Sequence, residues 1–163
     1  MVEINNTTKQ KININKTRQI VEYFLATHKK TNWEVSVAAV GPTRMRKLNK
    51  KYRGVDKATD VLSFRGGEAM NKFLGEIIIN IAETKKPSKY KEVFSDETEA
   101  DGLRGKALAG KRAEGRASLK SPDYLFYFLL VHGLLHLIGY DDKADSDRRK
   151  MIRLGTEFLA KIF

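Results

Sequence analysis

The hydrophobic pattern of the N-terminal half of the chain predicts two helices. In the first, hydrophobic residues recur at helical spacing after a cap at Asn15 or Thr17, and the helix ends at about His28. A second, shorter helix is predicted to follow a cap at Thr43 and to end near Gly54, because glycine commonly terminates helices. The first helix has an apolar stripe with which it can pack against a core.

Short runs rich in β-branched residues predict strands around these helices. The run WEVSVAAV partly alternates hydrophobic and polar positions, as a half-buried strand does. A glycine-containing loop separates the last two runs, which could therefore pair as a hairpin. The predicted strands are residues 2–5, 11–14, 33–40, 61–64 and 75–80.

The C-terminal part predicts one apolar and one amphipathic helix. Residues 123–138 are hydrophobic almost all round, after a cap at Ser121, so we expect this helix to be central and buried. Gly139 suits its end, and Asp145 or Ser146 opens the last helix. Helices combined with a few short strands predict an α+β or α/β fold, with a small mixed sheet packed by helices.

One stretch departs from these patterns, at about residues 85–120. It has few large hydrophobic residues, and its second half carries six Lys or Arg against one acid between Gly102 and Lys120. Such a segment buries too little surface to fold by itself, so we expect one domain, 1–163, with a flexible basic insertion. The insertion would serve either as an arm for RNA phosphates or as a solvated linker.

Charge and composition narrow the chemistry. The chain carries 31 Lys and Arg against 20 Asp and Glu, a net charge of +11, which favours a polyanionic partner such as nucleic acid; a solvated basic surface is the alternative. There is no cysteine, which excludes disulfides, a thiol nucleophile and thiolate metal ligands. Neither a signal peptide nor a membrane span is visible, so we expect a cytoplasmic protein without a membrane partner.

The segment VHGLLHLIGYDD predicts a metal site. His132 and His136 stand four residues apart, so on a helix both imidazoles project from the same face. Gly139 can reverse the chain and bring Asp142 toward them, which would leave a zinc ion with three ligands and one open position. Without that third ligand, the histidines could equally be hydrogen-bonded core residues.

This histidine spacing resembles two families, the metzincin proteases and the YbeY endoribonucleases. The proteases carry a glutamate directly after the first histidine as general base, whereas this chain has Gly133 there. HGLLHLIGYDD is similar to the YbeY motif HGxLHLxGYDH, and LNKKYRGVDKATDVLSF (residues 48–64) resembles a second YbeY signature. LGEIIIN (74–80) is similar to the LGDI strand of that family, with Glu76 in place of aspartate.

The YbeY resemblance implies a zinc-dependent, single-strand-specific endoribonuclease acting on ribosomal RNA of the small ribosomal subunit, in maturation and quality control. It implies zinc on His132, His136 and Asp142, although Asp142 replaces the family's third histidine. Arg53 corresponds to the arginine essential to activity and could grip a phosphate bidentately. Glu76 is a candidate for proton transfer by its motif position, or else a structural strand carboxylate.

The sequence alone leaves open the nucleophile, the function and the role of the insertion. Either a water made acidic by the metal or the 2′-hydroxyl of the RNA could be the nucleophile. A zinc metalloprotease is one alternative function, and a non-catalytic RNA-binding factor for ribosome assembly is another. The insertion would alter substrate access or contact RNA itself.

Overall fold

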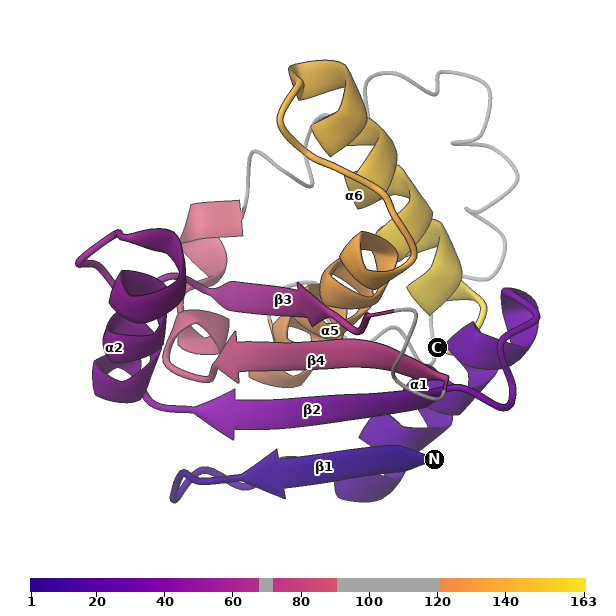
Figure 1. Ribbon diagram of the computed structural model, residues 1–163, viewed down its shortest axis with the longest axis horizontal. Coiled ribbons are helices and arrows are strands. Elements are labelled where there is room, and N and C mark those ends of the chain that lie inside the picture. Colours follow the sequence, from indigo (N-terminus) through magenta and orange to yellow (C-terminus); the bar gives the residue numbers. More distant parts are fainter. Residues whose placement is uncertain (68–71, 91–120) are drawn as a thin grey trace.

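The computed structural model describes residues 1–67, 72–90 and 121–163. Within them, four strands form one mixed sheet in the order β1-β2-β4-β3 (Figure 1). The first three strands in this order run parallel, and β3 is antiparallel to β4 at the edge. The predicted mixed sheet and hairpin are therefore confirmed. The strands are β1 Val2–Asn6, β2 Glu34–Val40, β3 Val61–Arg65 and β4 Phe73–Asn80.

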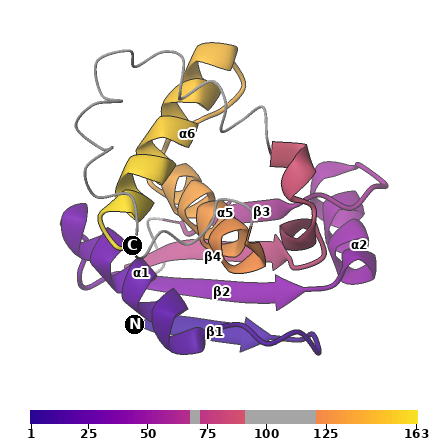
Figure 2. The same ribbon diagram turned by 180° about the vertical axis from the view of Figure 1, so that it is seen from behind.

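Helices cover the sheet unequally. Figure 2 shows α1 and α5 against one face, α6 beyond α5, and α2 at the end of the sheet. Met45 of α2 packs with Leu62 and Ile78 in a small second core on the opposite face from α5. The helices described are α1 Ile14–Thr27, α2 Pro42–Arg53, α5 Pro122–Leu137 and α6 Asp145–Ala160.

Helix α5 is the centre of the main core, as its all-round hydrophobicity predicted. It contacts α1, α6 and both strands of the hairpin. Its first turn is capped by Ser121, whose Oγ accepts a hydrogen bond from the Tyr124 N–H at 3.1 Å. None of the described helices combines the length and hydrophobicity needed to cross a membrane.

Two local predictions are wrong at helix starts. Residues 11–14 form no strand, because Asn13 caps α1 there, earlier than predicted, and accepts a first-turn N–H at 2.9 Å. The cap of α2 is Gly41 rather than Thr43, and Pro42 occupies the first helical turn, where its missing N–H costs nothing.

The beginning of the predicted insertion is built into the domain. Two short 3-10 helices, η1 (Glu83–Lys85) and η2 (Pro87–Tyr90), follow β4 directly. Thr84 and Tyr90 are buried, so side chains at both ends of this segment pack against the rest of the domain. The rest of that prediction, residues 91–120, lies outside the described residues.

Candidate metal centre

Two histidines interrupt the otherwise buried surface of α5. From Tyr124 to Leu137 every residue of the helix is buried except His132 and His136. One helical turn separates them, and their Nε2 atoms lie 3.1 Å apart with the ring planes nearly perpendicular. The helix therefore turns both imidazoles toward the same partly open side.

A tight turn after α5 brings a carboxylate to this pair. Gly139 has φ +111°, a conformation that strongly favours glycine, and the chain reverses there. The Tyr140 carbonyl lies 3.0 Å from His136 Nδ1, which leaves the Nε2 lone pair for a cation when Nδ1 carries the proton. Asp142 Oδ2 then lies 3.4 Å from His132 Nε2 and 3.7 Å from His136 Nε2.

The spacing of these three atoms fits a tetrahedral metal ion. With metal–ligand bonds of about 2.0–2.1 Å, two ligands of a tetrahedral zinc lie about 3.3–3.4 Å apart. The three separations in this protein, 3.1, 3.4 and 3.7 Å, bracket that value. His132, His136 and Asp142 can therefore hold one metal ion and leave a coordination position for another group.

The protonation states of the site also suit a cation. Burial and the neighbouring His132 lower the pKa of His136, so its imidazole is neutral at neutral pH. The hydrogen bond to His132, together with the charges of His136 and Arg148, lowers the pKa of Asp142 to about 2 against the opposing effect of burial. At neutral pH the site thus offers a neutral imidazole and a carboxylate.

These ligands line a cavity of about 520 Å³. Arg53 reaches it from the end of α2, which stops at Gly54 with φ +72°. Among the described residues the guanidinium of Arg53 has no hydrogen-bond or ion-pair partner, so its donors remain available to a ligand. The other charged side chains of the lining are Asp60, Asp141, Lys143 and Arg148.

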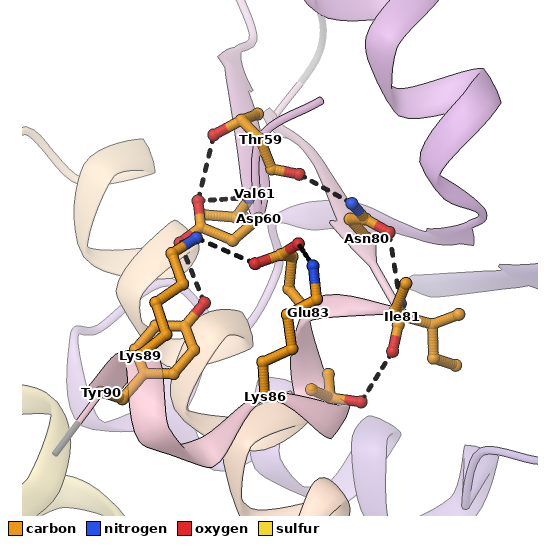
Figure 3. Close-up of polar contacts among 11 residues, drawn as sticks. Thr59, Asp60, Val61, Asn80, Ile81, Glu83, Lys86, Lys89 and Tyr90 are labelled. Atoms are coloured by element: carbon orange, nitrogen blue, oxygen red, sulfur yellow. Dashed lines mark hydrogen bonds and ion pairs between the residues drawn. The ribbon is translucent and has the colours of Figure 1, made fainter. Parts of the chain in front are cut away.

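A polar network centred on Asp60 builds one wall of the cavity (Figure 3). Asp60 Oδ1 accepts the Val61 N–H at 3.0 Å and the Thr59 hydroxyl at 3.1 Å, as expected for a capped strand start. Its Oδ2 accepts the Tyr90 hydroxyl at 3.0 Å and faces Lys89 Nζ at 3.7 Å. The carboxylate therefore joins the start of β3 to η2.

Burial alone would raise the pKa of Asp60. The charge of Lys89 and the hydrogen bonds from Tyr90, Thr59 and Val61 outweigh it, and the pKa is lowered. Lys89 is in turn held by Glu83 Oε2 at 2.9 Å. The network therefore keeps the Asp60 carboxylate ionised and its oxygens hydrogen-bonded. Asp60 thus has a structural role in the wall of the cavity.

The chain is similar to known proteins of one family. It matches the family model described as "Endoribonuclease YbeY" over residues 3–100 and 109–163. The chain belongs to the YbeY family. A Clostridium botulinum protein named Endoribonuclease YbeY is 31% identical, covering 98% of this chain and 95% of the relative. One of the same name from Thermodesulfovibrio yellowstonii is 34% identical, covering 78% of this chain and 66% of the relative.

A solved structure shares the fold of this chain. A Thermotoga maritima protein solved in solution superposes with a TM-score of 0.57 at 21% identity, over 97% of this chain and 86% of the other. Between the two parts that match the YbeY family model, residues 101–108 are not covered. This chain spans 57% of an Anaeromyxobacter relative of the same name, which is the longer protein.

Helix packing explains why this YbeY chain has glycine after its first histidine. Gly133 faces the sheet, where a Cβ would lie 2.8 Å from Ile77 Cγ2 and 3.2 Å from Ser63 Oγ. A glutamate at this position would collide with the hairpin instead of reaching the cavity. The protease arrangement of a general base at position 133 is therefore incompatible with how α5 packs.

The structure places Glu76 away from the cavity of the histidines. It pairs across the sheet with Phe64 and Ser36, and Ile78 two residues later belongs to the core under α2. Because side chains alternate along a strand, Glu76 lies on the sheet face opposite α5. It does not line the cavity of the histidines, and this position favours the structural role over proton transfer.

The structure adds cavity residues that sequence reasoning missed. Tyr90 and Arg148 both line the cavity beside the three predicted ligands. Tyr90 falls within the stretch that we took for an insertion, and Arg148 stands among similar charged residues on α6. No local pattern distinguished either residue, because only packing brings it to the cavity.

Proposed function

We propose that this chain is a zinc-dependent endoribonuclease that cleaves single-stranded RNA. The observation that carries the proposal is the meeting of three potential metal ligands with Arg53 in one cavity, where its guanidinium has no partner among the described residues. Membership of the YbeY family, whose relatives are named endoribonucleases, supports RNA as the substrate.

Zinc is the metal that we propose, bound by His132, His136 and Asp142. Two imidazoles with one carboxylate are typical of catalytic zinc sites, whereas magnesium and calcium prefer oxygen ligands alone. When bound, zinc would polarise a phosphate oxygen and make a bound water more acidic.

The protein's own groups then bind and orient the substrate. Arg53 offers a planar fork of donors that matches two oxygens of one phosphate, and it offsets charge that develops during attack. The bond between His136 and the Tyr140 carbonyl fixes the orientation of its ring. Asp60 holds the wall formed by η2 in place.

We further propose that the substrate is ribosomal RNA of the small subunit, and that the protein acts in its maturation and quality control in the cytoplasm. The YbeY motifs in residues 48–64 and 132–142 support this reading. The net charge of +11 is consistent with a polyanionic substrate.

The proposal is tested with untagged protein, a labelled single-stranded RNA, its duplex form and casein. We expect cleavage of the single strand alone, lost after chelation and restored by zinc. Arg53→Ala should reduce kcat/KM by about 100-fold or more, as removal of a transition-state donor does elsewhere. Arg44→Ala is the matched control, because Arg44 is an exposed arginine of the same helix that does not line the cavity.

Each alternative has its own outcome. Cleavage of casein but not of RNA would establish a protease, and RNA binding without cleavage by the zinc-loaded protein would indicate a non-catalytic factor. The product ends identify the nucleophile, because attack by the 2′-hydroxyl leaves a 2′,3′-cyclic phosphate and attack by water does not.

A further inference from the structure

Among the described residues, most charged side chains around the cavity have close partners, and the guanidinium groups of Arg53 and Arg148 are the exceptions. Asp60 is matched by Lys89 and the Tyr90 hydroxyl, and Asp141 Oδ2 lies 3.1 Å from Lys143 Nζ. Asp142 is one of the three candidate metal ligands. Of the charged side chains that line the cavity, Arg53 and Arg148 remain.

Arg148 has only a weak partner of its own. Its Nη1 lies 3.6 Å from Asp145 Oδ1, beyond hydrogen-bonding distance, and the side chains of both residues are well exposed. An exposed pair of this kind contributes little to stability and is easily exchanged for another partner. Among the described residues no hydrogen bond is donated by the Arg148 side chain, so its donors are available to a ligand in the cavity.

The two arginines approach the metal ligands from different elements. Arg53 comes from the end of α2, and Arg148 from the beginning of α6. In Figure 1, α2 lies at one end of the sheet and α6 rises beyond the β3 edge. A strand of RNA bound at the metal ligands would therefore meet one guanidinium from each side.

The metal ion and its ligands can balance the negative charge of only one phosphate. A divalent ion with one carboxylate ligand keeps a net charge of one, which balances the single negative charge of one phosphodiester. A neighbouring phosphate in the same cavity then needs a cation of its own, because an unpaired charge in a partly buried site is costly. Arg148 lines the same cavity as the three candidate metal ligands, so it lies where such a phosphate would bind.

We propose that Arg148 is a second phosphate-binding residue of the cavity, which grips a backbone phosphate next to the one bound by Arg53. The inference rests on the proposed RNA substrate and adds a specific subsite to it. Arg148 contributes to substrate binding, and Arg53 acts on the phosphate that is attacked.

The test compares zinc-loaded wild type, Arg148→Ala, Arg148→Lys and Arg149→Ala. Arg149 is the matched control, because it is the next residue on α6 and is exposed but does not line the cavity. Binding of a 2′-O-methyl RNA oligonucleotide is measured by fluorescence anisotropy over a range of salt concentrations, with its integrity checked on a gel. Cleavage kinetics of the unmodified RNA and zinc affinity are measured in parallel.

Losing one phosphate contact should reduce the slope of log K against log salt by about 0.7 for a single strand. We expect Arg148→Ala to show this change and to raise KM by about tenfold, the loss of a hydrogen bond to a charged group, with kcat and zinc affinity nearly unchanged. Arg148→Lys should keep the slope, and Arg149→Ala should resemble wild type.

Two results would overturn the inference while the proposed function stands. In one, Arg148→Ala and Arg149→Ala have the same slope and KM. In the other, Arg148→Ala loses zinc affinity with an unchanged slope, which would show that Arg148 acts on Asp142 instead of on RNA. Wild-type protein that neither binds nor cleaves RNA would refute the proposed function and this inference with it.

Discussion

Replacing Asp142 with alanine should remove most of the zinc affinity of this protein. Asp142 Oδ2 lies 3.4 Å from His132 Nε2 and 3.7 Å from His136 Nε2, so its carboxylate is one of three atoms that can share an ion. The substitution leaves two imidazoles on one helix turn. Asp142 is partly exposed, and its loss should therefore disturb the fold little.

The size of the effect follows from the number of ligands. Structural zinc sites with four protein ligands bind with about 10–16 kcal/mol at pH 7, or about 2.5–4 kcal/mol for each ligand on average. Because about 1.4 kcal/mol corresponds to a factor of ten, losing Asp142 should weaken zinc binding by about 100- to 1,000-fold.

Asp141 provides the matched control, one residue away and of the same charge. Its Oδ1 accepts the Asp142 N–H at 2.8 Å, and its Oδ2 pairs with Lys143, so it supports the turn without being one of the three ligands. Loss of a supporting hydrogen bond at a metal site costs about 10- to 100-fold, and we expect the lower value for this exposed group. Zinc affinity is measured at neutral pH by competition with a chromophoric chelator.

The reverse order of the two variants would refute this reasoning. If Asp141→Ala lost more zinc affinity than Asp142→Ala, the ligand would be Asp141, and the turn after Gly139 would have to differ. If neither substitution changed the affinity, the ion would not bind at this end of α5.

Further predictions concern the same cavity and its packing. Asp142→His should keep zinc and shift the acidic limb of the pH–rate profile to lower pH, because a neutral ligand leaves more charge on the metal. Gly133→Glu should destabilise the fold by about 3 kcal/mol or more in thermal denaturation, since even its Cβ would lie 2.8 Å from a side-chain carbon of Ile77. Tyr90→Phe should lower the free energy of unfolding in urea by about 1.5–3 kcal/mol, because it removes a hydrogen bond to the Asp60 carboxylate. The lowered pKa of Asp60 stabilises the fold above its unfolded value of about 3.9, and this contribution is lost as pH falls through the folded pKa; Asp60→Asn should remove that part of the acid dependence.

Each of these has a control or an opposing result. Gly67→Glu should be tolerated, because a Cβ there meets nothing within 4 Å; equal melting temperatures for the two glycine variants would contradict the packing argument. Tyr23→Phe should be nearly neutral, since Tyr23 is 45% exposed, and an equal loss at Tyr90 and Tyr23 would argue against the Asp60 bond. An unchanged pH profile in Asp142→His would contradict the charge argument, and an unchanged acid transition in Asp60→Asn would remove Asp60 from the linkage.

Local patterns along the chain determined much of the fold. The apolar stripe of α1, the β-branched runs of the strands and the all-round hydrophobicity of α5 each reflect interactions between residues close in sequence. The same holds for the candidate metal ligands. His132, His136 and Asp142 lie within eleven residues, and helix periodicity with one glycine turn is enough to bring them together.

The rest of the cavity was decided by tertiary structure. Arg53, Tyr90 and Arg148 come from three elements whose packing no local pattern encodes, and they meet the histidines only when α2, η2 and α6 are assembled. The position of Glu76 was decided in the same way, because the alternation of side chains along a strand sets two faces but not which of them α5 covers. Sequence periodicity thus defined the candidate metal ligands, whereas the groups that would bind RNA depend on contacts between residues far apart in the chain.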